Sequence, residues 1–342
     1  MTAHRTVVIC PGRGSYQRAQ LGTLQGRSKA VQEFLDRVDA FRSQRGLPTI
    51  RELDGAKRYS SAKHVAGQHA SLLTFAASVA DALELSDKHE IIGYSGNSMG
   101  WYTALALSGV LDWEDAFALV QTMADFQTGN TLGGQLLYPQ LNPDWTTSSE
   151  LSEAIERSLA NTPMTWWSIR LGSVAVLGAD ASGIKSLLKS LPPITRGTRT
   201  FPLQLPLHSA FHTPLLEHTS QKAVSALKGL RFRQPKAHLF NGHGVHYSPL
   251  SADPEQIRAY TLGSQVTEPY NYELATRSAL RFLAPSRIVL LGPGNSLGGP
   301  TAAILVNEGW SGLKSRADFE QLQTTAPLLF SFGLADQRAS LL

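Results

Sequence analysis

The sequence lacks the features that mark secreted and membrane-spanning proteins. Cys10 is the only cysteine among 342 residues, so no disulfide can form within the chain. It lies in the short apolar run 7–10, which suits a core residue better than a reactive thiol. No apolar run approaches the roughly 18 residues of a membrane span, and the N-terminus shows no secretory signal pattern. We therefore expect a cytoplasmic protein without a membrane span.

Strong charge and metal-ligand patterns are also missing. Lys and Arg number 31 against 27 Asp and Glu, a net charge of +4, and no Lys/Arg run is dense enough to predict nucleic-acid binding. His243 and His246 have a loose metal-like spacing, but no third ligand lies nearby, so we predict no metal site. Internal repeats and low-complexity segments do not stand out. The composition is that of an ordinary globular protein.

Short β-rich apolar runs alternate with longer stretches of helical periodicity, which predicts an α/β fold. The expected strands are 6–10, 90–94, 238–241 and 287–291. The expected helices are 31–44, 68–83, 99–108, 112–127, 214–227 and 272–284. Asp112 fits the N-cap of its helix, with acidic residues in the first turn.

The region 133–200 has a different order of elements. Its expected order is strand 135–139, helix 148–159, strand 165–170, strand 173–178, helix 180–190 and strand 199–203. This βαββαβ order is that of a ferredoxin-like unit. We expect a small subdomain at 133–200, inserted into a larger α/β body formed by 1–132 and 201–342.

One serine has the setting of a nucleophile. Ser98 lies in Gly-Asn-Ser-Met-Gly, between an expected strand and an expected helix, and so fits the G-x-S-x-G turn that exposes a nucleophilic hydroxyl. Ser95 does not fit, because the second residue after it is Asn97 rather than glycine. The alternative is that Ser98 only caps a helix. We take Ser98 as the candidate nucleophile.

A serine nucleophile needs a base, and His212 has the most suggestive setting. It precedes Pro214 at the start of an expected helix, where its side chain can point back toward a reaction site. The other histidines lack such a setting, and we take His208 and His218 as bystanders.

Several blocks resemble the malonyl-CoA:acyl-carrier-protein transacylases and the acyltransferase domains of polyketide synthases. GNSMGWYTALALSGVLDWEDAFALV resembles their GHSLGEYTAL block, and CPGRGS at 10–15 resembles their F-P-G-Q-G-S loop. LPLHSAFHTPLL is similar to A-F-H-S-P-L-M, FNG to V-x-N, SQVTEP to R-Q-L-x-x-P, and LGPGNSL to E-V-G-P-G-K-x-L. These matches run in family order through 6–305.

The resemblance implies an α/β-hydrolase-like body with the inserted ferredoxin-like subdomain, and a ping-pong acyl transfer. It makes Ser98 the nucleophile and His212 the base, with backbone carbonyls near Gln265 orienting the imidazole. Backbone N–H groups of Arg13 and Met99 would bind the oxyanion. The implied donor is a coenzyme A thioester and the partner an acyl carrier protein with its phosphopantetheine thiol. No bound cofactor or metal is implied.

The chain departs from the family at positions that contact the acyl group. Asn97 replaces the histidine before the nucleophile, and Trp101 replaces an acidic residue. Met123 stands where the family has the arginine that binds the malonyl carboxylate. The same resemblance makes Phe211 and Asn241 candidate substrate contacts. Because a thioether cannot pair with a carboxylate, we expect a non-carboxylated acyl group rather than malonyl, unless Met123 is simply a core residue.

Another arginine could still meet a carboxylate. Arg170 follows Trp166 and Trp167, which we expect to pack between the subdomains, and Arg13 lies in the glycine-rich loop. Two other functions remain open. Water in place of the thiol would make an acyl-carrier-protein hydrolase, and loss of activity would leave a docking subunit, which the intact Ser98 and His212 argue against. The acyltransferase is the favoured interpretation.

Overall fold

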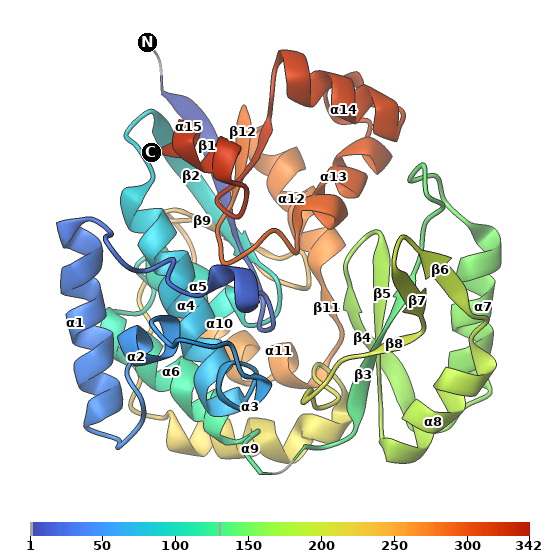
Figure 1. Ribbon diagram of the computed structural model, residues 1–342, viewed down its shortest axis with the longest axis horizontal. Coiled ribbons are helices and arrows are strands. Elements are labelled where there is room, and N and C mark those ends of the chain that lie inside the picture. Colours follow the sequence, from blue (N-terminus) through green and yellow to red (C-terminus); the bar gives the residue numbers. More distant parts are fainter. Residues whose placement is uncertain (1–2, 130) are drawn as a thin grey trace.

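A six-stranded sheet forms the centre of the larger part of the molecule. The computed structural model describes residues 3–129 and 131–342 (Figure 1). Within these ranges the sheet has the order β10-β9-β2-β1-β12-β13, parallel except at the edge strand β10. The strands are β1 (His4–Cys10), β2 (His89–Gly96), β9 (His238–Phe240), β10 (His246–Tyr247), β12 (Arg287–Leu290) and β13 (Leu329–Ser331). The four expected strands are all present, and the two added ones lie at the edges.

Helices surround this sheet (Figure 1). They are η1 (Arg18–Gln20), α1 (Lys29–Ser43), α2 (Ile50–Asp54), α3 (Ser61–His64), α4 (Gly67–Glu84), α5 (Gly100–Leu107), α6 (Trp113–Asp125), η2 (Pro214–Leu216), α9 (Glu217–Ala226), α10 (Pro254–Leu262), α11 (Ser264–Thr267), α12 (Tyr272–Leu283), α13 (Gly298–Asn307), η3 (Trp310–Gly312), α14 (Arg316–Thr325) and α15 (Ala335–Leu341). Asp112 caps α6 as expected, because its side chain accepts a hydrogen bond from Asp115 N at 3.0 Å.

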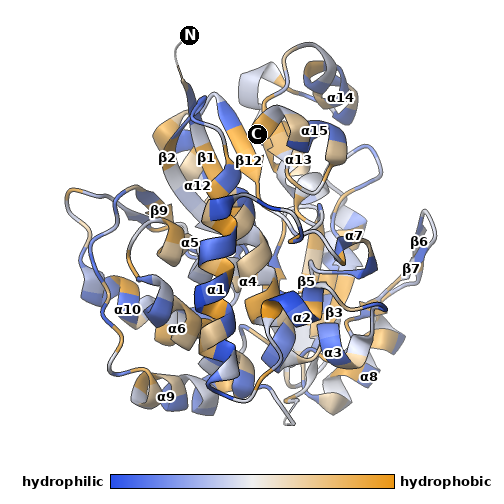
Figure 2. Ribbon diagram, turned by 60° about the vertical axis from the view of Figure 1, so that its left-hand side comes forward, coloured by the Kyte–Doolittle hydropathy of each residue, from blue (hydrophilic) through white to orange (hydrophobic). Residues whose placement is uncertain are grey.

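Burial follows the sequence pattern of the helices. In α1 the buried residues include Val31, Phe34, Leu35 and Val38, spaced so that they share one face. Figure 2 shows hydrophilic and hydrophobic residues alternating along this helix. In α4 every residue from His69 to Asp81 is buried, as expected of a helix without a polar face. Among the described residues, no helix has both the length and the apolar character that crossing a bilayer requires.

A second sheet forms the smaller subdomain. Its four main strands have the order β4-β5-β3-β8, and each neighbouring pair is antiparallel. With helices α7 and α8 this is the ferredoxin-like arrangement that the sequence predicts. The elements are β3 (Gly134–Pro139), α7 (Ser149–Ala160), β4 (Thr165–Arg170), β5 (Val174–Ala179), α8 (Ala181–Ser190), β6 (Ile194–Arg196), β7 (Arg199–Phe201) and β8 (Leu203–Gln204). The fold class is confirmed: a large α/β subdomain carries a small ferredoxin-like one.

Two details of this sheet differ from the expectation. The single strand 199–203 is divided at Pro202, which has no N–H to donate, so β7 pairs with β6 and β8 pairs with β3. A fifth strand, β11 (Tyr270–Asn271), joins the sheet beside β4 from the larger subdomain. The limits 133–200 for the inserted unit stay a prediction. Strand β11 pairs only with β4, and the side chain of its Tyr270 donates a hydrogen bond to Gly96 O of β2 in the larger sheet.

Candidate active site

The turn between β2 and α5 holds Ser98 in a strained backbone conformation. Ser98 has a φ of 56°, in the left-handed region that side chains rarely adopt. The glycines on either side leave no room for a side chain. A Cβ on Gly100 would collide with the carbonyl of Cys10, and one on Gly96 would collide with the backbone of Gly100. This is the geometry that a nucleophile turn requires, and such strain is typical of functional positions.

His212 lies directly against this serine. Its Nε2 is 2.7 Å from Ser98 Oγ, although 114 residues separate the two in sequence. His212 also has a left-handed φ of 58°. The structure therefore brings together the two residues that the sequence predicts as nucleophile and base, each in a conformation that costs free energy.

Gln265 fixes the orientation and the tautomer of the imidazole. His212 Nδ1 is 2.6 Å from the backbone carbonyl of Gln265, and a carbonyl can only accept, so Nδ1 carries the proton. Nε2 is then the unprotonated nitrogen that faces Ser98. The Gln265 side chain accepts from Tyr102 Oη at 3.0 Å and donates to Ser98 O at 3.2 Å. A backbone carbonyl thus takes the place that an aspartate has in a triad.

Burial keeps His212 neutral. Its side chain is 4% exposed, and desolvation lowers its pKa to about 4, although the hydrogen bond to Gln265 opposes this shift. At neutral pH the imidazole is therefore unprotonated, as a general base must be.

Two backbone N–H groups near Ser98 stay candidates for an oxyanion hole. Cys10 and Gly96 are paired neighbours at the ends of parallel strands, so the loop at 11–14 lies beside Ser98. A Cβ on Gly12 would be 2.9 Å from Asn97 O, which shows how closely the two loops approach. In the described part of the chain, neither Arg13 N nor Met99 N donates a hydrogen bond. Both are the donors that the family resemblance implies for the oxyanion hole, and this role stays a prediction.

Phe211 and the side chain of Arg13 lie on the same side of the site. The guanidinium carbon of Arg13 is 5.3 Å from the centre of the Phe211 ring, and Arg13 Nη2 donates to Leu207 O at 2.6 Å. His208 also packs against Phe211, with ring centres 5.8 Å apart. Burial, and then the charge of Arg13, lower the pKa of His208 to about 3, and its Nδ1 bonds Gln135 at 2.9 Å. His208 is therefore a neutral neighbour without a contact to Ser98 Oγ among the described residues.

Met123 and Asn97 stay candidates. Met123 is half-buried near the end of α6 and packs against the main core. Asn97 precedes the nucleophile and is half-buried, with its Oδ1 shielded from solvent and without a partner among the described atoms. The core contact of Met123 fits the alternative that it is simply a core residue, so both assignments stay predictions.

Trp101 and Asn241 have other roles than substrate contacts. The Trp101 indole is 0% exposed, packs edge-on against Tyr260, and donates to Thr261 Oγ1 at 2.9 Å. The Asn241 amide is 1% exposed; it accepts from the N–H groups of His243 and Val245, and donates to Tyr247 Oη. One side chain belongs to the core and the other to a loop, so the prediction of substrate contacts is wrong for both.

Arg170 is likewise placed elsewhere. Its guanidinium carbon lies 3.7 Å from the ring centre of Trp167, whose Nε1 donates to Glu156 of α7 at 3.1 Å. Burial lowers the pKa of Arg170, and Glu156 and Glu273 partly offset this shift. Arg170 therefore has acidic neighbours of its own, and its expected role as partner of an acyl carboxylate is not supported.

The other excluded residues are also accounted for. Ser95 is 0% exposed and donates to Phe240 O at 3.0 Å, so it joins two strands of the sheet. His238 Nδ1 lies 2.6 Å from His246 Nε2, and His243 faces Glu268. Within the described residues no group of three or more His, Cys, Asp or Glu is placed to hold a metal ion.

Two residues of the site escaped the sequence analysis. Tyr270 donates to Gly96 O at 2.6 Å, and its ring centre lies 5.4 Å from that of His212. Ser168 of the small sheet donates to Phe211 O at 2.7 Å and so holds the loop that carries His212. Tyr270 directly follows the SQVTEP block, and its position next to this block could have identified it as a residue of the site. Nothing in the spacing identified Ser168.

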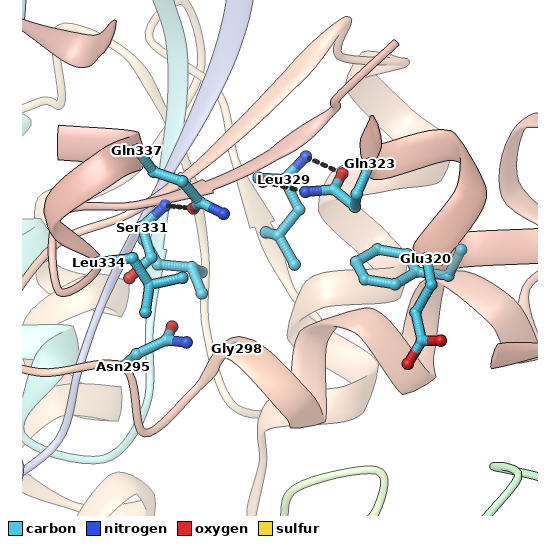
Figure 3. A pocket seen from close by; sticks show the side chains of 10 residues that line it. Asn295, Gly298, Glu320, Gln323, Leu329, Ser331, Leu334 and Gln337 are labelled. Atoms are coloured by element: carbon cyan, nitrogen blue, oxygen red, sulfur yellow. Dashed lines mark hydrogen bonds between the residues drawn. The ribbon is translucent and has the colours of Figure 1, made fainter. Parts of the chain in front are cut away.

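A separate cavity of about 280 Å³ lies at the outer edge of the large sheet, between β13, α14 and α15 (Figure 3). The polar groups at its wall are bonded to the backbone of β13. Gln323 bonds Leu329 N and O, and Gln337 accepts from Ser331 N (Figure 3). These groups stabilise the edge strand, and none of them is a candidate for catalysis.

Comparisons with known proteins agree with this architecture. No family model matches the chain. Polyketide synthase GfsB of Streptomyces halstedii is 26% identical over 203 residues, which are 59% of this chain and 3% of that protein. The acyl-carrier-protein S-malonyltransferase of Burkholderia pseudomallei has a TM-score of 0.76 at 20% identity, over 98% of this chain and 99% of that one.

A second similar structure is a malonyl transacylase in complex with a holo acyl carrier protein of a type II polyketide synthase. It has a TM-score of 0.75 at 17% identity, over 98% of this chain and 99% of that one. The chain therefore has the fold of the malonyl-CoA:acyl-carrier-protein transacylases, with a large α/β subdomain and a small subdomain. The fold that the sequence resemblance implies is confirmed.

Proposed function

We propose that the chain is an acyltransferase that moves an acyl group between coenzyme A and an acyl carrier protein through an ester on Ser98. The observation that carries this proposal is the 2.7 Å contact between Ser98 Oγ and the unprotonated Nε2 of His212. The fold, shared with malonyl transacylases, and the likeness to a polyketide synthase support this reaction class. The pathway would be fatty-acid or polyketide synthesis.

Each step can be assigned to a group at the site. His212 Nε2 takes the proton of Ser98 as Oγ bonds to the thioester carbon, and the N–H groups of Arg13 and Met99 bind the oxyanion. The carbon–sulfur bond then breaks, and His212 returns the proton to the thiolate of coenzyme A. In the second half, His212 takes the proton of the phosphopantetheine thiol of the carrier protein as its sulfur bonds to the ester carbon. The bond from that carbon to Ser98 Oγ then breaks, and His212 returns the proton to Oγ. The chemistry needs no metal or bound cofactor.

The proposal also specifies the acceptor of the acyl group and the chemical class of the acyl group. Hydrolysis of the same acyl-enzyme by water would give a carrier-protein hydrolase, and only the measured acceptor distinguishes the two. Met123 supplies no charge from α6, so α6 itself favours an uncharged acyl group over malonyl, as the sequence predicts. The cytoplasmic location also stays a prediction.

Intact-mass spectrometry of the protein after incubation with a panel of acyl-CoA donors tests the proposed reaction. We expect at least one donor to add its acyl mass to the wild type and not to Ser98→Ala. Ser95→Ala is the matched control, since Ser95 lies three residues away and bonds only the sheet; it should still form the adduct. An adduct that persists in Ser98→Ala would contradict the proposal.

A further inference from the structure

The loop that carries His212 lies against the small sheet. A Cβ on Gly178 of β5 would be 2.7 Å from Thr213 Cγ2, so the loop can approach the strand this closely only because the residue is glycine. The Cβ of Ser168 on β4 lies 3.3 Å from the same position. The base therefore rests on the smaller subdomain, whereas the nucleophile belongs to the turn between β2 and α5 of the larger one.

Ser168 is an extra residue in the pairing of β4 with β5. Trp167 pairs with Leu177 and Ile169 pairs with the next residue of β5, Val176, so the register shifts at Ser168. Such a bulge changes the direction of a side chain, and bulges are common beside active sites. The Ser168 side chain is also 0% exposed. A buried hydroxyl needs hydrogen-bond partners, and these partners indicate the role of the bulge.

Three side chains form a series of hydrogen bonds that ends on the peptide group before His212. His208 Nδ1 lies 2.9 Å from Gln135 Oε1. Gln135 Nε2 donates to Ser168 Oγ at 2.6 Å, and Ser168 Oγ donates to Phe211 O at 2.7 Å. An amide oxygen and a carbonyl oxygen can only accept, so each group in the series donates toward Phe211 O. The direction of the Ser168 proton is therefore fixed.

The carbonyl at the end of this series controls the backbone of the base. Phe211 O belongs to the peptide group that joins Phe211 to His212, and the orientation of this group sets the φ angle of His212. That angle is 58°, in a strained region that persists only when surrounding contacts hold it. His212 Nε2 is 2.7 Å from Ser98 Oγ, so a rotation of the peptide would move the imidazole away from the nucleophile.

We infer that Ser168 is a positioning residue, which holds the imidazole of His212 against Ser98 by bonding the peptide group before it. The inference rests on the proposed function and deepens it, because it makes the smaller subdomain part of the catalytic geometry. Gln135, oriented by His208, occupies the acceptor side of the Ser168 hydroxyl and leaves its proton for the loop. A bond that only tied the two subdomains together would not have to end on this strained peptide.

The test measures how fast Ser98 reacts with a fluorophosphonate probe, whose phosphorus bonds to an activated serine with loss of fluoride. This reaction needs the base but does not depend on the acyl group. We expect Ser168→Ala to react about ten- to a hundredfold more slowly, because a displacement of about 1 Å at a reacting group can cost about a hundredfold. Gln135→Leu keeps the donor of Ser168 and should lose much less. Ser158→Ala is the matched control, since Ser158 is a buried serine of α7 in the same subdomain, and it should react like the wild type.

Urea titrations separate positioning from stability. Gln135 and Ser168 each take part in two hydrogen bonds of the series, so Gln135→Leu and Ser168→Ala should lose similar free energies of unfolding. Equal slowing of the probe reaction in both variants would show that the rate follows the stability of the small sheet and would overturn the inference. A Ser168→Ala variant that reacts at the wild-type rate would overturn it as well. If Ser168→Ala does not fold, Ser168→Cys, which keeps a weaker donor, should show a smaller slowing in its place.

A wild type that does not react with the probe at Ser98 would contradict the proposed function instead. In that case NMR of protein with 15N-labelled histidine still decides, because it observes His212 without any reaction. In the wild type the imidazole should stay neutral at pH 5, with its Nδ1 proton bonded to Gln265 O. In Ser168→Ala the released ring should titrate closer to the ordinary histidine pKa of about 6.5. The same titration of His212 in both proteins would overturn the inference.

Discussion

Acylation of this protein should stay fast at a pH where an ordinary histidine base would be protonated. His212 is 4% exposed, its Nδ1 proton is held by the Gln265 carbonyl at 2.6 Å, and desolvation lowers its pKa to about 4. The perturbation is a change of pH from 7 to 5. The reacting form is the neutral imidazole, so the rate follows the fraction of unprotonated His212.

The magnitude follows from that pKa. With an ordinary histidine pKa near about 6.5, the neutral fraction would fall about 25-fold between pH 7 and pH 5. With a pKa of about 4, the neutral fraction at pH 5 is still roughly nine-tenths, so the rate should fall by only about 10%. The difference between the two profiles exceeds tenfold at pH 5, well beyond the error of a rate measurement.

Single-turnover acylation, quenched at short times and read as the mass of the acyl-enzyme, gives this rate directly. Circular dichroism at each pH must show that the protein is still folded. A flat profile from pH 5 to pH 8 is expected. A loss of about 25-fold at pH 5 in folded protein would refute the idea that burial keeps His212 neutral.

Three further predictions follow from the site and the core. Acylation in His212→Ala should be slower by about two to four orders of magnitude, whereas His208→Ala should keep most of the rate; the reverse order in stopped assays would move the base to His208. As pH falls below about 6.5, His212 becomes protonated in the unfolded state but stays neutral in the folded state, so protons stabilise the unfolded state. This difference should lower the free energy of unfolding of the wild type by about 2 kcal/mol between pH 7 and pH 5. Urea titrations at both pH values should show that loss in the wild type and not in His212→Phe. Trp101→Ala should cost about 3–5 kcal/mol of stability without changing donor preference in the folded fraction; a changed preference would return Trp101 to the site.

The pairing of Ser98 with His212 was predictable because each residue lies in a short sequence motif that determines its local backbone geometry. Gly96 and Gly100 lie where a side chain would collide with neighbouring backbone, and both glycines can be seen in the sequence without a structure. The Asp112 cap and the order of elements in the small subdomain were readable for the same reason, since both depend on local patterns.

The direction of a side chain was not predictable in this way. Trp101 follows the nucleophile closely, but its indole turns toward Thr261 and the core, and position in a motif does not distinguish the two faces of a helix. Strand β4 has an irregular register between Trp167 and Ile169, which breaks the alternation of its faces ahead of Arg170. For Arg13 the sequence left both a backbone role and a side-chain role open, and the three-dimensional arrangement shows its guanidinium beside the Phe211 ring.

The central claim is that an acyl group passes through Ser98 to a carrier-protein thiol. The most direct test loads the protein with its preferred acyl-CoA, removes free donor, and adds a holo acyl carrier protein or its apo form without the phosphopantetheine thiol. Intact masses of both proteins are then followed with time. The acyl mass should leave Ser98 and appear on the holo carrier, while the loaded protein stays acylated in the presence of the apo form. Loss of the acyl group at the same rate with either form, without any gain of mass on the holo carrier, would contradict the claim and identify water as the acceptor.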